Sequence, residues 1–590
     1  MRRYIFLALL FLNFHALQAL EIDPTYYIYP LKNVARLYSA NFGELRPDHF
    51  HSGVDIKTDG VEGKSVVAVA DGYVSRLGLS PSGYGLALYV THPNGTTSVY
   101  GHLSRFRDDL ARRVRYERYS QKKHSVSLFF KPEEFPVKQG ELIAYSGNSG
   151  SSSGPHLHYE IRETASQRPI NIFAKGIIKP RDTRRPWFVK IHYIEVDTLN
   201  GVAYHSPRKT YSVLNPSVGQ YTLNTPGNTI TVGRKGYFVA EVTDRKNDVT
   251  NTFGVHSFGA QVDGDYFFKY QMDGFTFATT RYVNGVSCYA LKLGSRNEVI
   301  RLAQQEYATS QFYPLIKERG VVRCEVNQRR EVIMKTADDC GLEATLKFTI
   351  VGSEQSWAAK ADASRPIIYS NRSFTHSDDG LSVSIPAKSL YESMPYLCEI
   401  VTPRNLKIDS LVRVVSPTYK ILCDSIPLHK AMTISIATPL TQEEATHATI
   451  AKISRKGVAA AVGGTYKDGK MTIESRSAGS YFVAVDTTPP TIEANFADGA
   501  DLSGKSSLSF TVSDNFSGIA EYSATINGEW VALEYSRGRL IHNIVSDREV
   551  DGLYMQKRDD KGEHTIIIEV VDGCGNRCSM ERKFAWDDIV

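Results

Sequence analysis

Cysteine is absent from the first 287 residues of this sequence. None of the seven cysteines precedes Cys288, so a metal or catalytic site in the first 287 residues must use other side chains. The sequence also lacks a large excess of either charge, with 69 Lys and Arg and 64 Asp and Glu. The net charge of +5 gives no reason to expect a nucleic-acid partner. No run reaches the roughly 18 apolar residues of a membrane-spanning helix, so we expect no transmembrane segment.

The N-terminus has the pattern of a secretory signal peptide. Arg2 and Arg3 precede an apolar run from Tyr4 to Leu12, and Leu17-Gln18-Ala19 offers a small residue at a cleavage point. We therefore predict a signal peptide over residues 1–19. The mature protein is expected to be secreted across the inner membrane into the periplasm or cell envelope.

An oxidising compartment would allow disulfides among the later cysteines. Cys574 with Cys578, and Cys398 with Cys423, are the pairs that the sequence suggests. The odd number of cysteines leaves at least one thiol free or intermolecular, and the spacing does not fix the connectivity.

Histidines are concentrated where cysteines are absent. In the stretch His156-Leu157-His158, an extended strand would place both imidazoles on one face, about 7 Å apart. Upstream, His51 and Asp55 flank Gly53, which we interpret as a kink that lets both reach one ion. Two nitrogens and one carboxylate oxygen are ligands that zinc accepts, with a fourth position left for water.

A further histidine, His102, ends the strand-like run Ser98-Val99-Tyr100. A hydrolytic zinc site needs groups that take a proton from water and stabilise the developing oxyanion. His102 and His156 are the candidates for that role.

These motifs, in this order, resemble the lysostaphin/LytM-type zinc metallopeptidases. The similar stretches, which span about residues 40–165, are His51-Ser52-Gly53-Val54-Asp55, Val67-Ala68-Val69-Ala70-Asp71-Gly72, Gly83-Tyr84-Gly85, His92-Pro93-Asn94-Gly95, Tyr100-Gly101-His102-Leu103 and Gly154-Pro155-His156-Leu157-His158. The resemblance implies that His51, Asp55 and His158 bind one zinc ion and that His102 and His156 are catalytic. It also implies that the substrate is the peptide cross-link of peptidoglycan.

The resulting hypothesis is a secreted zinc metalloendopeptidase that hydrolyses peptidoglycan cross-links. The alternative is a non-catalytic envelope scaffold, adhesin or activator that keeps the fold only as a binding surface. A third hypothesis is an enzyme that acts on secreted proteins. Retention of all five site residues favours an enzyme, but the sequence does not identify the bond that is cleaved.

Two features depart from the family pattern. His49 lies two residues before His51 and could compete with it as a ligand. Residues 104–138 form a long insertion with ten basic and five acidic side chains. This insertion either overhangs the groove and selects substrate, or is a solvated surface excursion with one helix near Arg105–Tyr119.

The remainder of the chain is rich in strand and turn signals and partly repeated. Asp182-Thr183-Arg184-Arg185-Pro186 resembles Asp486-Thr487-Thr488-Pro489-Pro490, and each precedes a run of short strands. Asp263-Gly264 and Asn527-Gly528 indicate matching hairpin turns. The aspartates around Asp514 could suggest calcium, but tight-turn chemistry is the simpler explanation.

We therefore predict an all-β protein: a LytM-like antiparallel β peptidase domain followed by about three β-sandwich, immunoglobulin-like domains. The expected boundaries are 1–19 for the signal peptide, 20–180 for the peptidase domain, and 181–353, 354–485 and 486–590 for the sandwiches. The sandwiches could bind envelope proteins or the cell wall. Because every ligand-type cluster precedes residue 165, we expect them to be dispensable for the chemistry itself.

Overall fold

The computed structural model describes residues 21–309, 311–354, 357–359, 365–544 and 562–586, so the predicted signal peptide lies outside the described part. Strands dominate this part, and nearly all of them pair antiparallel, which confirms the predicted all-β class. None of its helices is long and apolar enough to cross a membrane. The alternation of buried and exposed side chains that predicts strands is visible in β23, Glu343–Gly352, where every second residue is buried.

The first β region contains the histidine motifs. Its sheet has the order β1-β2-β10-β6-β5-β4-β7, with β9 pairing β6 and β3, and β8 pairing β4. The strands are β1 Tyr38–Ala40, β2 Val54–Lys57, β3 Ser65–Val67, β4 Gly72–Leu79, β5 Leu86–Thr91, β6 Thr96–Phe106, β7 Val126–Phe129, β8 Pro136–Val137, β9 Leu142–Ser146 and β10 His156–Glu163. This order places β10 between β2 and β6, so all three histidine motifs lie on adjacent strands.

The insertion at residues 104–138 contains a helix, as predicted. Helix α1, Asp108–Gln121, begins with two aspartates that favour the positive end of the helix dipole. It ends at Lys122 in the left-handed conformation. Leu110 and Val114 face the core of the first β region, so one side of the helix is anchored to it.

The second β region is one large sheet in the order β19-β16-β11-β13-β14-β23-β22-β17-β18-β20, with β12, β15 and β21 at its sides. The strands are β11 Trp187–Leu199, β12 Val202–His205, β13 Lys209–Ser217, β14 Gln220–Leu223, β15 Thr229–Val232, β16 Lys235–Thr243, β17 Ser257–Val262, β18 Asp265–Gln271, β19 Glu298–Arg301, β20 Leu315–Ile316, β21 Val322–Arg323, β22 Arg329–Ala337 and β23. Two short helices, α2 Val283–Val286 and α3 Tyr289–Lys292, precede β19.

The third and fourth β regions each contain facing sheets. The third has the orders β25-β26-β31-β35-β34 and β28-β30-β36-β32-β33, with β29 pairing β36 and the pair β24-β27 beside them. Its elements are β24 Ile367–Ile368, β25 Phe374–Ser377, β26 Leu381–Ile385, β27 Met394–Pro395, β28 Cys398–Val401, β29 Arg413–Val414, β30 Thr418–Ile421, β31 Pro427–Ala437, α4 Gln442–Thr446, β32 Ala448–Ile453, β33 Ala459–Gly463, β34 Thr465–Lys467, β35 Lys470–Ser477 and β36 Gly479–Val485.

The fourth has the orders β37-β39-β43-β42 and β38-β45-β44-β40-β41. Its strands are β37 Thr491–Ala494, β38 Ala500–Asp501, β39 Leu508–Ser513, β40 Ile519–Ile526, β41 Glu529–Trp530, β42 Glu534–Ser536, β43 Arg539–His542, β44 Glu563–Asp572 and β45 Arg577–Ala585. Separate apolar cores fill the third and fourth regions, as expected for sheets packed face to face.

The repeated motifs of the second and fourth regions adopt the same local structure. Asp263 and Asn527 both have positive φ, each is followed by a glycine with positive φ, and each pair joins two antiparallel strands. These are the hairpin turns that the sequence predicts. A second pair of turns also matches: Asp338-Asp339-Cys340-Gly341 joins β22 to β23, and Asp572-Gly573-Cys574-Gly575 joins β44 to β45.

The expected disulfides are wrong, because all seven cysteines are free. Cys574 is buried in the turn between β44 and β45, whereas Cys578 lies on β45 opposite Val570. Cys398 pairs in register with Ile421, and Cys423 is an exposed residue beyond the end of β30. Closeness in sequence or in neighbouring strands does not bring two sulfur atoms to bonding distance.

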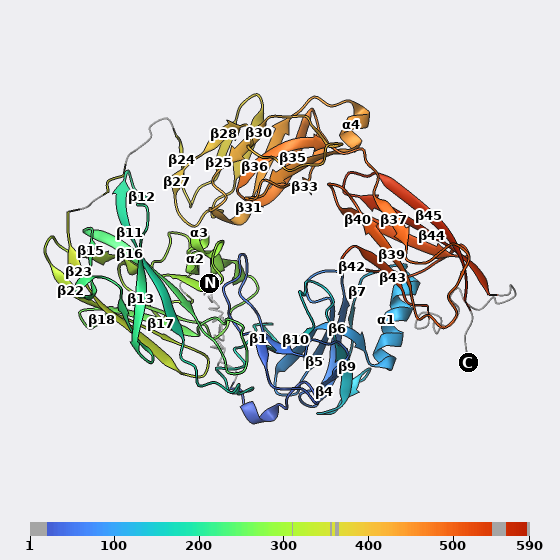
Figure 1. The fold of residues 1–590 in the computed structure, drawn as a ribbon, viewed down its shortest axis with the longest axis horizontal. Coiled ribbons are helices and arrows are strands. Elements are labelled where there is room, and N and C mark those ends of the chain that lie inside the picture. Colours follow the sequence, from blue (N-terminus) through green and yellow to red (C-terminus); the bar gives the residue numbers. More distant parts are fainter. Residues whose placement is uncertain (1–20, 310, 355–356, 360–364, 545–561, 587–590) are drawn as a thin grey trace, which may run out of the picture.

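The four β regions follow one another around a ring, and the fourth returns to the first (Figure 1). Tyr119 at the end of α1 packs edge-on against Trp530, with ring centroids 5.4 Å apart. The ring of His124 also contacts Trp530, at 5.1 Å. Arg118 donates to the carbonyl of Leu533 at 3.0 Å. The insertion is therefore a contact surface for the last β region, an outcome that neither sequence-based interpretation of it anticipated.

The first and second β regions share an apolar core. Phe42, Leu45 and Phe50, which precede the metal-type motif, are at most 2% exposed and belong to the same cluster as Phe275 and Phe312 of the second region. The ring of Phe50 lies 4.8 Å from that of Phe312. The loop that leads to His51 is thus held from outside the first region.

This shared core predicts that a fragment of residues 21–180 is much less stable than a fragment of residues 21–353. Phe42, Leu45 and Phe50 would be exposed in the shorter fragment, and burial of each such side chain contributes about 1.5–3 kcal/mol. Thermal unfolding followed by circular dichroism provides the comparison. Equal melting temperatures would show that the second region does not stabilise the first.

Candidate metal centre

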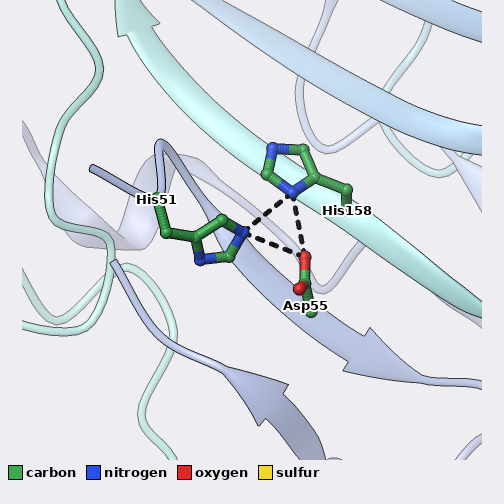
Figure 2. Close-up of side chains that lie close together, drawn as sticks. All are labelled: His51, Asp55 and His158. Carbon is green, nitrogen blue, oxygen red and sulfur yellow. Dashed lines mark hydrogen bonds and ion pairs between the residues drawn. The ribbon is translucent and has the colours of Figure 1, made fainter. Parts of the chain in front are cut away.

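Three metal-type side chains converge at the junction of β2 and β10 (Figure 2). The antiparallel register places His158 directly opposite Asp55, and His51 reaches the same point from the segment that precedes β2. The Nε2 atom of His51 lies 3.1 Å from Nδ1 of His158 and 3.2 Å from Oδ1 of Asp55. The Nδ1 atom of His158 lies 2.9 Å from Oδ1 of Asp55. The structure therefore brings together the three predicted ligands.

Gly53 permits this arrangement by leaving room for a neighbouring strand, and its φ is not positive. A Cβ atom at this position would lie 2.4 Å from the carbonyl oxygen of Tyr159 and 3.0 Å from Nε2 of His158. The approach of β10 to the segment before β2 thus requires glycine. The chain bends at Gly53, directly before β2, as predicted, and the glycine also allows a close contact between two chain segments.

The outer nitrogen of each histidine is fixed by an acceptor. The Nδ1 of His51 donates to the carbonyl of Asn41 at 2.7 Å, and the Nε2 of His158 donates to Glu160 at 2.8 Å. Each imidazole therefore turns a lone pair inward, toward Oδ1 of Asp55. Such outer partners are typical of histidines that bind metal.

The donor set and its spacing fit a zinc ion. Tetrahedral ligands with bonds of about 2.0–2.1 Å lie about 3.3 Å apart, close to the separations among His51, Asp55 and His158. Three inward lone pairs repel one another unless a positive charge lies between them. That charge is supplied either by a proton on His158 or by a metal ion.

The pKa directions agree with this need for positive charge. Burial by itself would lower the pKa of His158, but hydrogen bonds to Asp55 and Glu160 outweigh burial and raise it to about 9. Burial would raise the pKa of Asp55, yet His51 and His158 hold it well below its usual range. Burial lowers the pKa of His51 to about 4, so this imidazole is neutral at neutral pH and its lone pair is available.

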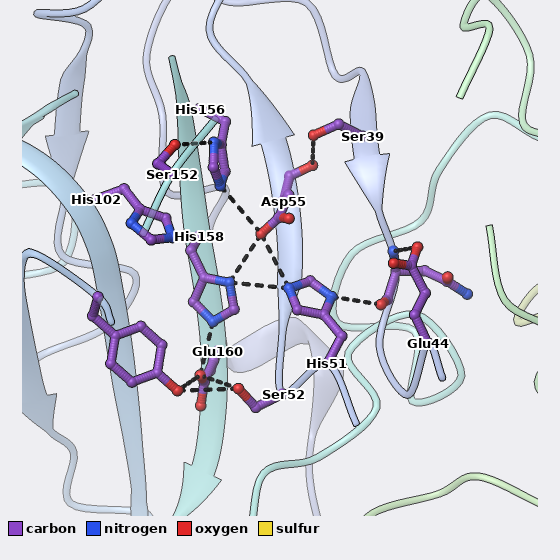
Figure 3. A network of polar contacts seen from close by, with 12 residues as sticks. Ser39, Glu44, His51, Ser52, Asp55, His102, Ser152, His156, His158 and Glu160 are labelled. Carbon is purple, nitrogen blue, oxygen red and sulfur yellow. Dashed lines mark hydrogen bonds and ion pairs between the residues drawn. The ribbon is translucent and has the colours of Figure 1, made fainter. Parts of the chain in front are cut away.

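The two remaining predicted histidines lie beside this cluster (Figure 3). The Nδ1 of His156 donates to the carbonyl of Gly154 at 2.8 Å, and its Nε2 lies 3.6 Å from Oδ1 of Asp55. The Nδ1 of His102 donates to the carbonyl of Ser149 at 2.8 Å. The rings of His102 and His156 have centroids 4.8 Å apart, so both flank the same space.

His102 adopts a backbone conformation that is rare for a residue with a side chain. Its φ of 58° falls in the left-handed region, and such residues cluster at functional sites because surrounding structure must hold them. Burial lowers its pKa to about 4, with neighbouring His158 and His156 adding to the effect. His102 is therefore a neutral imidazole that can accept a proton at Nε2.

One open cleft of about 1150 Å³ is lined by all five predicted site residues: His51, Asp55, His102, His156 and His158. His49 also lines this cleft, but its side chain is half exposed and pairs with Asp48 rather than with the cluster. No residue of the insertion 104–138, which is described throughout, lines the cleft. Phe277 and Thr280 of the second β region do line it, so the cleft is formed by two β regions.

Glu160 is a site residue to which the sequence analysis gave no role. It is fully buried, accepts from His158, and is also bonded by Ser52 and Tyr84, each at 2.7 Å. Arg162 donates to its second oxygen at 2.6 Å. The alternation of β10 was the available signal, because residues 156, 158, 160 and 162 share one face.

The carbonyl that orients His51 is itself held by the second β region. The side chain of Asn41 accepts from the backbone of Gly254 at 2.8 Å and donates to Asp339. The carboxylate of Glu44 accepts the Asn41 backbone N–H at 3.0 Å. No local sequence pattern connects Asn41 with Gly254 and Asp339, so this support was not foreseeable.

Comparison with known proteins shows two matching families. Residues 49–118 and 115–172 match peptidase family M23, and residues 366–486 match the Zu5-like domain. A stretch of 134 residues is 33% identical to the DD-carboxypeptidase/endopeptidase Mpg of Neisseria meningitidis and covers 23% of this chain and 24% of that protein. Another of 141 residues is 35% identical to an uncharacterized metalloprotease of Haemophilus influenzae and covers 22% of this chain and 24% of that protein. The chain thus spans about a quarter of the length of the curated relatives it matches.

Solved structures similar to the chain include peptidases. A zinc-containing peptidase from Vibrio cholerae is 26% identical over 24% of this chain and 38% of its own, with a TM-score of 0.18. The catalytic domain of lysostaphin from Staphylococcus simulans is 24% identical over 22% of this chain and 80% of its own, with a TM-score of 0.16. The predicted resemblance to LytM-type peptidases is confirmed by the family match over residues 49–172.

Proposed function

We propose that residues 49–172, a domain of peptidase family M23, act as a zinc-dependent endopeptidase on the peptide cross-links of peptidoglycan. One observation carries the proposal: three inward-facing ligand atoms meet two further histidines, His102 and His156, in a single cleft. An endopeptidase that hydrolyses by metal-activated water needs both sets of groups. A scaffold that only binds has no need of either.

His51, Asp55 and His158 would hold the zinc ion, with Asn41 and Glu160 fixing the two imidazole rings. Zinc in such a site lowers the pKa of water to about 7 and polarises the scissile carbonyl. Asp55 contributes the negative charge that balances the ion. The fully buried Glu160 keeps the outer nitrogen of His158 protonated, and so keeps its inner nitrogen free for the metal.

His156 and His102 would move the proton. Each uses its Nδ1–H on a backbone carbonyl, so a neutral ring can only accept a proton at Nε2. We assign to them removal of a proton from the attacking water. Once protonated, the same ring donates to the tetrahedral oxyanion or passes the proton to the leaving amine.

The cleft suits an extended peptide. Besides the metal cluster, its lining includes the segment 151–155 and Phe277 and Thr280. The substrate class rests on the family and on the curated relative whose name describes a DD-carboxypeptidase/endopeptidase. The signal-peptide pattern of residues 1–19 supports a place in the cell envelope, where peptidoglycan lies.

The β regions after residue 181 would contribute to the site and to localisation. The second holds the loop around His51, and the fourth donates from Arg537 to the carbonyl of Ser152 at 3.0 Å, beside the cleft. These regions are also the surfaces by which the protein could reach the cell wall or other envelope proteins. We propose the immunoglobulin-like class for the second and fourth regions from their paired linker and turn motifs.

Digestion of purified peptidoglycan tests this function. The full-length protein should release fragments that mass spectrometry identifies as products of peptide-bond cleavage. Treatment with 1,10-phenanthroline should stop the release, and added zinc should restore it, because the three ligands belong to a reversible metal site. Absence of fragments from the zinc-loaded protein would leave the binding-scaffold alternative in its place.

A further inference from the structure

The second and fourth β regions each contain a cluster of three aspartates. In each cluster, one carboxylate oxygen from every member lies within 4.8 Å of the others. The members of the first cluster are Asp182, Asp244 and Asp338, and those of the second are Asp486, Asp514 and Asp572. Both clusters join a linker aspartate to aspartates at the ends of two strands, so the repeated motifs build the same arrangement twice.

The backbone contacts of the two clusters match. The Oδ1 of Asp182 accepts from the backbone of Arg184, as Oδ1 of Asp486 does from Thr488. The Oδ1 of Asp338 accepts two backbone N–H groups of its turn, those of Cys340 and Leu342. The Oδ1 of Asp572 accepts the corresponding pair, from Cys574 and Asn576. These bonds fix the carboxylates in place. In the second cluster Oδ2 of Asp572 and Oδ2 of Asp514 also accept hydrogen bonds, from Asn576 and from the turn after Asp514.

A lysine supplies positive charge to the first cluster. The Nζ of Lys246 lies 3.1 Å from Asp182 and 3.4 Å from Asp244. Lys246 is 1% exposed, and burial alone would lower its pKa; Asp244, Asp339 and Asp182 outweigh burial and raise the pKa. A charged ammonium is therefore built into this cluster.

The second cluster has no such lysine. Lys246 follows Asp244 by two positions, and the residue two positions after Asp514 is Phe516, which packs against the apolar surface of the third β region. Within the described ranges, no lysine or arginine forms an ion pair with Asp486, Asp514 or Asp572. Three carboxylates are thus gathered without a counter-charge, which is costly in a buried place.

Unsatisfied oxygens in the second cluster indicate the position of a ligand. Asp486 is fully buried, and its Oδ2 accepts no hydrogen bond. The Oδ1 of Asp514 is likewise buried without a partner. Native proteins rarely leave buried carboxylate oxygens unsatisfied, and an unseen cation is one of the few explanations. The first cluster also has two such oxygens, on Asp244 and Asp338, but there the ammonium of Lys246 supplies the positive charge.

We propose that Asp486, Asp514 and Asp572 bind one calcium ion. Oxygen-only ligands select a hard cation, and two oxygens bound at about 2.3–2.6 Å lie at most about 5 Å apart, as the cluster requires. Calcium accepts several carboxylates together with backbone carbonyls and water, whereas magnesium usually keeps most of its water and binds one or two carboxylates. Three converging carboxylates therefore fit calcium.

The ion would lock the joint between the third and fourth β regions. Asp486 lies in the linker that joins them, and its backbone donates to the carbonyl of His447 at 3.1 Å. Asn576 of the fourth region donates to the carbonyl of Asp486 at 2.8 Å, and the His447 ring bonds the carbonyl of Cys574 at 3.1 Å. Calcium would fix the angle at which the fourth region leaves the linker, and so its contact with α1.

Equilibrium dialysis of the zinc-loaded, full-length protein against radioactive calcium tests the site. The native protein should bind one calcium per chain, and zinc content should not change. Asp514→Asn keeps an oxygen for the turn N–H groups of Phe516 and Gly518 but removes the charge, so calcium affinity should fall at least tenfold. Phe516→Lys should abolish binding, because it places an ammonium where Lys246 lies in the first cluster.

Asp338→Asn provides the matched control in the lysine-containing cluster and should leave calcium stoichiometry unchanged. Circular dichroism spectra show which variants fold, and Asp514→Asn alone decides the outcome if Phe516→Lys does not. The proposal is overturned if the native protein takes up no calcium at millimolar concentration. It is overturned equally if the folded Asp514→Asn variant binds calcium as tightly as the native protein.

Discussion

Replacing His158 with alanine is expected to remove zinc from the protein and, with it, all measurable peptidase activity. His158 contributes one of the three ligand atoms and is the residue through which Glu160 acts on the site. Loss of an outer partner of a metal ligand typically costs about 10- to 100-fold in affinity, and loss of the ligand itself should cost more. Asp55→Asn should behave similarly, because it removes the charge that balances the ion.

Metal analysis after gel filtration measures the effect directly. His49→Ala is the matched control, since His49 lies in the same cleft but pairs with Asp48 and should not affect zinc content. Thermal unfolding of each variant separates loss of metal from loss of fold. Full zinc occupancy in folded His158→Ala and Asp55→Asn would show that the ligand assignment is wrong.

Replacing His156 with alanine should lower kcat on a soluble cross-link peptide by about 100- to 10,000-fold while zinc stays bound. His102→Ala should have an effect in the same range. Neither ring belongs to the three-ligand cluster, but both lie beside it, and Nε2 of His156 is 3.6 Å from Oδ1 of Asp55. The loss should therefore fall on the proton transfers rather than on metal binding.

The double variant gives a sharper test of this assignment. If both histidines serve one step, the combined loss should be smaller than the product of the single losses. Added imidazole should restore part of the rate to His156→Ala, whose removed ring leaves space in the open cleft. If a variant cleaves peptidoglycan at the native rate, the histidine that it lacks is not catalytic, whatever the zinc content of the variant.

Local sequence determined much of this protein. The period-two pattern of His156-Leu157-His158 predicts two imidazoles on one face of a strand, and β10 has them there. The turn residues Asp263-Gly264 and Asn527-Gly528 predict hairpins because few other residues accept positive φ, and both hairpins form. The helix in residues 104–138 follows from the same kind of short-range signal.

The tertiary structure decided what connects distant parts of the chain. Asn41 is fixed by Gly254 and Asp339, more than 200 residues away, and this contact orients His51. The contact between α1 and Trp530 likewise joins parts of the chain that are far apart in sequence. Such contacts have no periodicity, because they depend on how separately formed sheets pack.

The aspartate clusters show both contributions in one place. The sequence repeats the linker and turn motifs, and by themselves their aspartates are explained by turn hydrogen bonds, which the structure contains. Only the fold brings Asp486, Asp514 and Asp572 within reach of one another, and only the fold places Lys246 in one cluster and Phe516 outside the other. Chemistry that needs three separated segments at one point is decided by packing, whereas each segment's own turn or strand is decided by its residues.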